Sequence, residues 1–175
     1  MRVYEGGALS EHLATMPLGD GLAFKHIPFN VKTQYPFEKK LGMIAGGTGI
    51  TPALQALHAV LGAPGDSTEV SLVYGSKTAD DILAADVLDA WAAAHPRLSV
   101  THVLSAEPAD SAWTGARGFV DADLVAARLP APGDGQIFVC GPEPMYDALC
   151  GPRGDPELTG VLREMGYEKE EVVKF

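Results

Sequence analysis

Residues Gly42–Pro52 read GMIAGGTGITP, and this stretch decides the fold class. A short apolar run leads into the turn Gly46-Gly47-Thr48-Gly49, and an apolar pattern of helical period follows over about Thr51–Leu61. Pro52 suits the first turn of that helix, where a missing N–H group costs nothing. The glycines let main-chain N–H groups at the helix N-terminus face a pyrophosphate without a Cβ atom in the way. The stretch predicts a strand, an anion-binding turn and a helix, and a tight turn without a ligand is the alternative.

The rest of the chain continues this alternation of strand and helix. Short runs rich in Val, Ile and Leu predict strands at Leu41–Ile44, Glu69–Tyr74, Leu98–Leu104, Gln136–Cys140 and Val172–Phe175. Segments of helical period predict helices at about Thr51–Leu61, Asp80–Ala94, Asp121–Arg128, Pro142–Leu149 and Glu157–Met165. We therefore expect an α/β fold with a doubly wound parallel sheet of five strands, in the order 3-2-1-4-5, and helices on both faces.

The first forty residues break this alternation. They hold a Gly-rich turn, one short helix from about Ser10 to Met16, and a stretch with Pro28 and Pro36 that has the composition of a linker. We expect residues 1–40 to form a separate small segment and residues 41–175 to form one domain with its own core.

A second loop, Cys140-Gly141-Pro142-Glu143-Pro144-Met145, also stands where an expected strand ends and a helix begins. The carboxyl ends of parallel strands meet at one edge of a sheet, so this loop and the Gly-rich turn should together form a crevice. We expect Cys140 to point into it, and a buried thiol that serves only packing is the alternative.

Charge and cysteine content exclude several classes of protein. The net charge is -10 and no dense cluster of Lys and Arg occurs, so a nucleic-acid partner is not expected. Cys140 and Cys150 fit neither a disulfide framework nor a zinc site, which predicts no metal and a reducing intracellular compartment, either cytoplasmic or organelle-associated. Neither a signal peptide nor a run of about 18 apolar residues is found, so we expect no membrane anchor in this chain.

The two loops together resemble the paired signatures of the ferredoxin-reductase superfamily. They match best the cytochrome b5 reductases, and the flavin modules of nitrate reductases are similar. In that family the Gly-rich loop receives the nicotinamide dinucleotide, the threonine before the proline lies against the flavin, and the cysteine borders the site of hydride transfer. The resemblance implies orienting or catalytic roles for Thr48, Thr51, Cys140 and Phe175, the last of which matches the aromatic end of these reductases. It implies cofactor binding by Gly46, Gly47, Thr48, Gly49, Thr51, Pro52, Cys140, Gly141, Pro142 and Met145.

Two further segments extend the resemblance. Asp81-Ile82-Leu83 is similar to the family segment in which an aspartate meets the adenosine ribose, so Asp81 would favour NADH by repelling a 2′-phosphate. An acidic residue that only stabilises the first turn of a helix is the alternative, and Lys77 keeps NADPH possible. Gly118-Phe119-Val120 resembles a segment near the nicotinamide loop, which gives Phe119 a cofactor contact; a place in the apolar core is the alternative.

Near the N-terminus, Gly6–Ser10 resembles the family's flavin loop. The resemblance implies that Gly7, Ala8, Leu9 and Ser10 hold the FAD pyrophosphate. Ser10 would also suit the N-cap of a helix from Glu11 to Met16, and a plain cap is the alternative. The family's R-x-Y-S/T signature has no equivalent, so residues 1–40 would be a small remnant of a flavin-binding β-barrel. A homo-oligomer or a complementing chain would then cover its exposed apolar residues, or the chain is a truncated product of a longer reductase.

The resemblance implies an NADH-dependent flavoprotein reductase module of the NADH-cytochrome b5 reductase type. Hydride would pass from NADH to FAD, and electrons would leave singly to a haem protein such as cytochrome b5. The alternative is a non-catalytic or truncated dinucleotide-binding module that has lost flavin binding. A nucleotide-binding enzyme unrelated to flavins would need both signatures to occur by chance.

Overall fold

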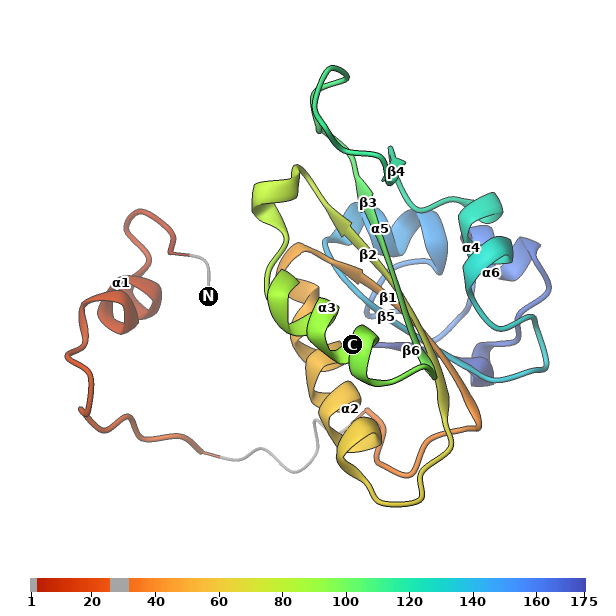
Figure 1. The fold of residues 1–175 in the computed structure, drawn as a ribbon, viewed down its shortest axis with the longest axis horizontal. Helices are drawn as coiled ribbons and strands as arrows, with labels where there is room; N and C mark the ends of the chain where they lie inside the picture. The colour runs from red at the N-terminus through yellow and green to blue at the C-terminus, as the bar shows by residue number, and fades with distance from the viewer. Residues whose placement is uncertain (1–2, 26–31) are drawn as a thin grey trace. The chain divides into compact units, whose positions relative to one another are not determined.

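Six parallel strands form one sheet in the order β4-β3-β2-β1-β5-β6 (Figure 1). Their bounds are Lys40–Gly46 for β1, Glu69–Ser76 for β2, Leu98–Leu104 for β3, Ala116–Arg117 for β4, Gln136–Cys140 for β5 and Val172–Lys174 for β6. The five expected strands have the expected order. The expected number of strands was wrong, because β4 adds a sixth beside β3. With only two residues, β4 has no apolar periodicity that the sequence could reveal.

Five helices accompany the sheet, and they are α2 at Ile50–Gly62, α3 at Ala85–Ala94, α4 at Ala122–Arg128, α5 at Glu143–Leu149 and α6 at Gly160–Glu164. Two expected helices are shorter than predicted. The helix expected from Asp80 is divided into the 3-10 turn η3 at Ala79–Asp81 and α3, because Ala84 between them has a positive φ of 57°. The helix expected from Glu157 begins only at Gly160, whose φ is 68°.

The helices cover both faces of the sheet, which confirms the doubly wound architecture. In Figure 1, α2 and α3 lie on one face, and α4, α5 and α6 lie on the other. Side chains of β1 alternate between the two layers: Leu41, Met43 and Ala45 join the core under α2, while Ile44 joins the core under α5. Burial on both sides explains why these strands read as continuous apolar runs.

The structure is a computed structural model that describes residues 3–25 and 32–175. Contacts divide the chain into two compact units, residues 1–31 and residues 32–175. Within residues 3–25 the first unit has one helix, α1 at Ala8–Thr15, and no strand. The N-cap of α1 is Gly7, so the expected cap at Ser10 was wrong. A domain boundary near residue 40 stays a prediction, as does the barrel remnant, and Pro28 of the expected linker lies outside the described residues.

Aromatic contacts hold the segment before β1 on the second unit. The Phe37 ring packs edge-on against Phe138 of β5 at a centroid distance of 5.3 Å. The Tyr35 hydroxyl donates to Asp66 at 2.7 Å, and Asp66 pairs with Arg97 at 3.1 Å. Residues 35–37 are therefore part of the packed body that carries β1.

Candidate functional site

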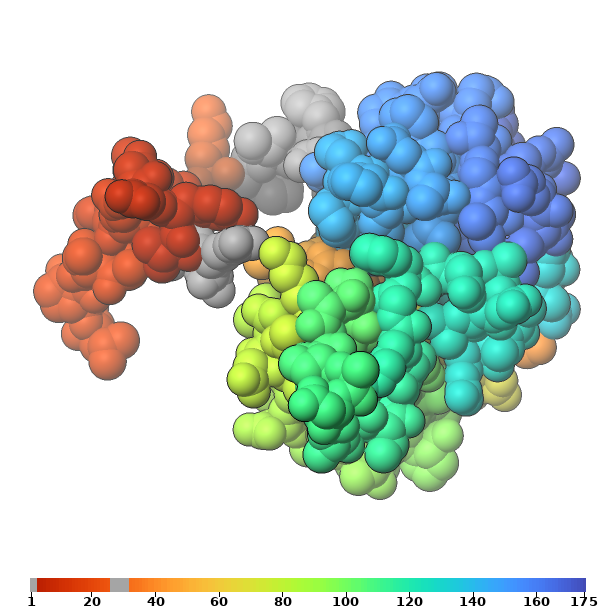
Figure 2. Space-filling model, turned by 90° about the horizontal axis from the view of Figure 1, so that it is seen from above, coloured from red at the N-terminus to blue at the C-terminus, as the bar shows by residue number. Residues whose placement is uncertain are grey.

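The predicted nucleotide loops follow the carboxyl ends of parallel strands, so the fold brings them to one edge of the sheet. The Gly-rich loop follows β1, the segment with Asp81 follows β2, and Cys140 ends β5. Figure 2 looks down onto this edge, where the orange segment that includes the Gly-rich loop lies between the yellow-green chain after β2 and the blue chain after β5. We take this edge as the candidate dinucleotide site.

The Gly-rich loop is a 3-10 turn, η2 at Gly47–Gly49, that runs directly into α2. Gly47 has a φ of 53°, and a Cβ atom on it would meet no other atom within 4 Å. Thr48 and Thr51 are exposed, and the Thr51 hydroxyl donates to the Thr48 carbonyl at 3.3 Å. The loop therefore presents an open face at the positive end of a 13-residue helix.

The opposite face of the loop packs closely against the segment that starts at Cys140. A Cβ atom on Gly49 would overlap the main chain at Cys140. A Cβ atom on Gly46 would lie 2.7 Å from the terminal methyl of Met145, and one on Gly141 would lie 2.6 Å from the Met145 sulfur. The two sequence signatures are thus in direct contact, and this contact requires glycine at position 49, where the Cβ atom would meet main-chain atoms.

Tyr146 connects the end of β5 with the end of β6. Its side chain is fully buried, and its hydroxyl donates to the main-chain oxygen of Phe175 at 2.5 Å, with the Val139 oxygen at 3.3 Å. Burial raises the pKa of Tyr146, and the neighbouring half-buried Cys140 raises it further, so the hydroxyl stays protonated as a donor. The Phe175 ring packs on Phe138 at 5.1 Å. Cys140 and Phe175, both predicted site residues, are brought together through Tyr146.

Asp81 lies in η3, exposed, at the same edge. One of its oxygens, Oδ2, accepts hydrogen bonds from the Thr78 N–H at 3.2 Å and from the Thr78 hydroxyl at 2.9 Å. The alternative stabilising role therefore exists in the structure, as a capping box. Both bonds use one oxygen, so the geometry is also compatible with a ribose contact through Oδ1. Lys77 shortly precedes Asp81 in the sequence, and its side chain is exposed.

Phe119 follows β4 and is 80% exposed, so the alternative place in the apolar core is wrong. Arg117 of β4 holds the preceding loop in place, because its guanidinium donates hydrogen bonds to the main-chain carbonyls of Glu107, Pro108 and Trp113. The fold leaves the Phe119 ring at the carboxyl edge without burying it.

The predicted flavin loop belongs to the first unit and is described by itself. Ser10 lies in the first turn of α1, where its hydroxyl accepts from the Tyr4 N–H at 3.1 Å and donates to the Gly7 carbonyl at 3.0 Å. Glu11 accepts from the Gly6 N–H at 2.7 Å. Ala8, Leu9 and Ser10 supply the main-chain amides of the first helical turn, which lack intrahelical acceptors.

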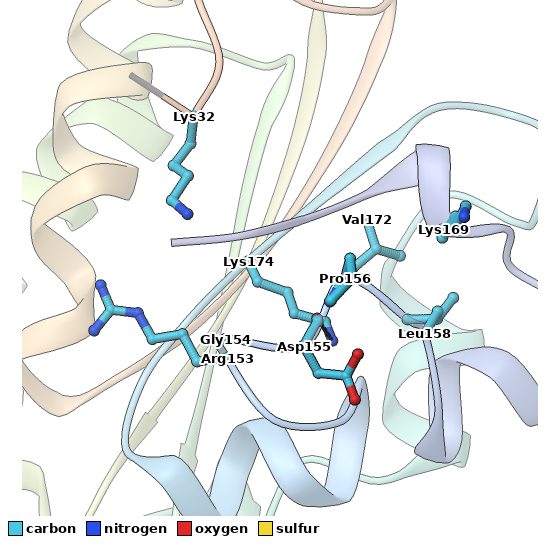
Figure 3. Close-up of a pocket in the computed structure, with 9 residues that line it drawn as sticks. All are labelled: Lys32, Arg153, Gly154, Asp155, Pro156, Leu158, Lys169, Val172 and Lys174. Atoms are coloured by element: carbon cyan, nitrogen blue, oxygen red, sulfur yellow. Dashed lines mark hydrogen bonds between the residues drawn. The ribbon is translucent and has the colours of Figure 1, made fainter. Parts of the chain in front are cut away.

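Two cavities lie outside these loops. One, of about 260 Å³, lies beside the edge strand β6 and is rich in basic side chains (Figure 3). Its Lys174 ammonium donates to the carbonyls of Pro152, Asp155 and Glu157, and so holds the neighbouring loop against β6. The other cavity, of about 230 Å³, includes Lys40 and Glu69 at the amino ends of β1 and β2. Neither of these two cavities is lined by the Gly-rich loop or by the segment that starts at Cys140.

Sequence reasoning missed three residues at this edge. Tyr74 and Tyr146 look like ordinary core residues in the sequence, and only the structure shows where their hydroxyls end. Ser76 at the end of β2 is 8% exposed, and its hydroxyl oxygen has no hydrogen-bond partner among the described residues. A polar residue that follows an apolar strand run was the available signal for Ser76.

The residues present fit a nicotinamide dinucleotide. Gly47 leaves space for a phosphate beside the N-terminus of α2, and the buried Ser76 hydroxyl at the same edge has no hydrogen-bond partner among the described residues. No group of three or more His, Cys, Asp or Glu side chains in residues 3–25 and 32–175 could hold a metal ion. In the same described ranges, no helix is long and apolar enough to cross a membrane.

The chain is similar to known oxidoreductases. Residues 43–151 match the family model of the oxidoreductase NAD-binding domain. All of the chain aligns with NADH-cytochrome b5 reductase 2 of Scheffersomyces stipitis at 44% identity over 180 residues, and it spans 60% of that protein's length. The cytochrome b5 reductase domain of Ulva prolifera nitrate reductase has a TM-score of 0.68 at 35% identity, over 79% of this chain and 50% of that one. The CS-b5R domains of human Ncb5or, in the NAD+ form, have a TM-score of 0.71 at 26% identity, over 98% of this chain and 46% of that one. The resemblance to the NADH-cytochrome b5 reductases is confirmed, and the chain belongs to the oxidoreductase NAD-binding domain family.

Proposed function

We propose that this chain is the nicotinamide-binding part of an NADH-dependent flavoprotein reductase. The packing of Gly49 against Cys140 carries the proposal, because it joins the two signature loops into one site at the carboxyl edge of the sheet. A bound NADH would supply a hydride, and a bound FAD would supply the chemistry that converts a two-electron transfer into single-electron transfers.

Each part of the edge has a separate task. The N–H groups of the Gly-rich loop and the N-terminus of α2 hold the pyrophosphate. The Asp81 carboxylate accepts a hydrogen bond from a ribose hydroxyl and repels a 2′-phosphate, which favours NADH over NADPH. Thr48 and Thr51 orient the reacting rings, and Cys140 and Phe175 border them and exclude water.

The FAD site is the less complete part of the proposal. Gly7, Ala8, Leu9 and Ser10 would hold the FAD pyrophosphate at the N-terminus of α1. The chain spans 60% of the length of its relative in Scheffersomyces stipitis.

The electron acceptor is a haem protein in this proposal. Its support is the name of the relatives, which are NADH-cytochrome b5 reductases in Scheffersomyces stipitis, Candida albicans and Dictyostelium discoideum. A reducing compartment, in the cytoplasm or associated with an organelle, is proposed with it, because the two cysteines are free thiols.

A second candidate function is a dinucleotide-binding module without flavin. It is favoured by the lack of any strand in residues 3–25, the part of the first unit that the structure describes. This module would bind the dinucleotide at the same carboxyl edge of the sheet.

An absorption spectrum separates the two functions. The purified chain is mixed with excess FAD, desalted and then treated with NADH without oxygen. Retained flavin bands that bleach within seconds would support the reductase. Loss of the flavin on desalting, together with NADH binding in calorimetry, would support the module without flavin.

A further inference from the structure

Tyr74 is a fully buried tyrosine whose hydroxyl reaches the candidate site. It lies on β2, in register with Ala45 of β1 and His102 of β3, and its ring is 5.8 Å from the His102 ring. The ring belongs to the core beneath α2 and α3. Its position in the centre of the sheet gives the hydroxyl a rigid support.

The hydroxyl joins two loops that are far apart in the sequence. It donates to the Gly47 carbonyl at 2.9 Å and accepts from the Leu83 N–H at 3.3 Å. Gly47 opens the pyrophosphate loop, and Leu83 follows Asp81 by two residues. One oxygen atom therefore connects the turn proposed to hold the pyrophosphate with the segment proposed to hold the ribose.

The electrostatic surroundings keep this oxygen protonated. Burial is the main cause that raises the pKa of Tyr74, and the negative charge of Asp81 raises it as well. The hydroxyl therefore remains a hydrogen-bond donor to Gly47 at neutral pH.

We propose that Tyr74 is a positioning residue that fixes the spacing between the pyrophosphate half and the ribose half of the dinucleotide site. This inference rests on the proposed function. A ligand that occupies both halves depends on their spacing, whereas a ligand in the ribose half alone does not. The Tyr74 hydroxyl should therefore contribute more to the binding of NADH than to the binding of AMP.

The chain provides a matched control in Tyr167. This tyrosine is also fully buried, its pKa is also raised by burial, and its hydroxyl donates to the Pro130 carbonyl at 2.5 Å. Pro130 precedes β5, so the bond lies near the amino edge of the sheet. Tyr167→Phe removes the same kind of hydrogen bond without touching the proposed site.

The test compares Tyr74→Phe, Tyr167→Phe and the native chain in calorimetric titrations with NADH and with AMP. For Tyr74→Phe we expect the Kd of NADH to rise about 3- to 10-fold and that of AMP less than about 2-fold. For Tyr167→Phe both constants should stay within about 2-fold of the native values. Equal weakening of NADH and AMP by Tyr74→Phe, or equal effects of the two variants, would overturn the positioning role.

Hydrogen exchange tests the same link without nucleotide. In Tyr74→Phe the amide of Leu83 should exchange at least about 10-fold faster than in the native chain, since its acceptor is gone. An unchanged rate would overturn the inference even if NADH binding is intact. A different result would contradict the proposed function instead: the native chain binds no NADH, while the Leu83 amide still exchanges faster in Tyr74→Phe.

Discussion

Gly49 and Cys140 lie in main-chain contact, closely enough that no side chain fits between them. This contact joins the turn before α2 to the end of β5, and it explains why the turn needs glycine there. Gly47 needs glycine for a different reason, since its Cβ position is open but its φ is positive.

Gly49→Ala should damage both packing and binding. The added methyl group must push the Cys140 segment away, which we expect to lower the free energy of unfolding by about 1–3 kcal/mol. NADH binding should weaken as well, because both loops move. Urea denaturation and calorimetry measure the two effects. Gly62→Ala at the end of α2 is the control, because its added Cβ meets nothing within 4 Å; a similar loss in that variant would refute the steric argument.

Asp81→Ser should reduce the preference for NADH over NADPH by about tenfold, because the carboxylate that repels a 2′-phosphate is gone. Loss of the capping box should cost about 0.5–2 kcal/mol of stability. Thr78→Ala removes the hydroxyl half of the same capping box but keeps the carboxylate. The ratio of the Kd values for NADPH and NADH should therefore change only in Asp81→Ser. Equal changes in both variants would assign the effect to the turn rather than to the charge.

Cys140→Ser should slow hydride transfer more than it weakens nucleotide binding, because the thiol borders the reacting rings in the proposed site. Stopped-flow bleaching of the flavin-loaded protein by NADH gives the rate, and calorimetry gives the Kd. Cys150→Ala is the control at a buried thiol on another element. A parallel loss of rate and affinity in Cys140→Ser would point to disturbed packing.

Stability should fall on the alkaline side. Burial raises the pKa of Cys150 from 9.0 to about 11. Because the folded state holds this proton more tightly, its contribution is complete below about pH 9 and is lost as pH rises toward 11, by roughly 2–3 kcal/mol. Urea denaturation at several pH values should show that the free energy of unfolding falls more steeply with rising pH in the native chain than in Cys150→Ala. Part of the fall should persist in the variant, since Tyr74, Tyr146 and Tyr167 also have raised pKa values. Identical slopes would mean that the thiol does not contribute.

The sequence predicted the five main strands because each is a short apolar run. It predicted their order because the alternation of strands and helices is typical of a doubly wound parallel sheet. It did not predict β4, whose two residues pair with Val103 and Leu104 only after the fold forms. It also did not predict the break at Ala84, because nothing in the sequence distinguishes that alanine from its helical neighbours.

The candidate site was predictable to the level of loops but not of hydrogen bonds. Parallel strands bring their carboxyl ends together, so the Gly-rich turn, Asp81 and Cys140 could be placed at one edge from sequence order alone. The bonds from Tyr74 to Gly47 and from Tyr146 to Phe175 depend on strand register and on side-chain direction. When a tyrosine stands in an apolar run, the sequence does not indicate where the tyrosine hydroxyl will lie in the folded protein.

The most direct test of the account is to map NADH on the isotope-labelled chain by NMR. We predict that the amide signals of residues 46–52, 76–83 and 140–145 shift on titration, while those of residues 127–130 at the amino edge do not. Shifts confined to the cavity beside β6, or to the amino edge, would contradict a dinucleotide site at the carboxyl ends of the strands.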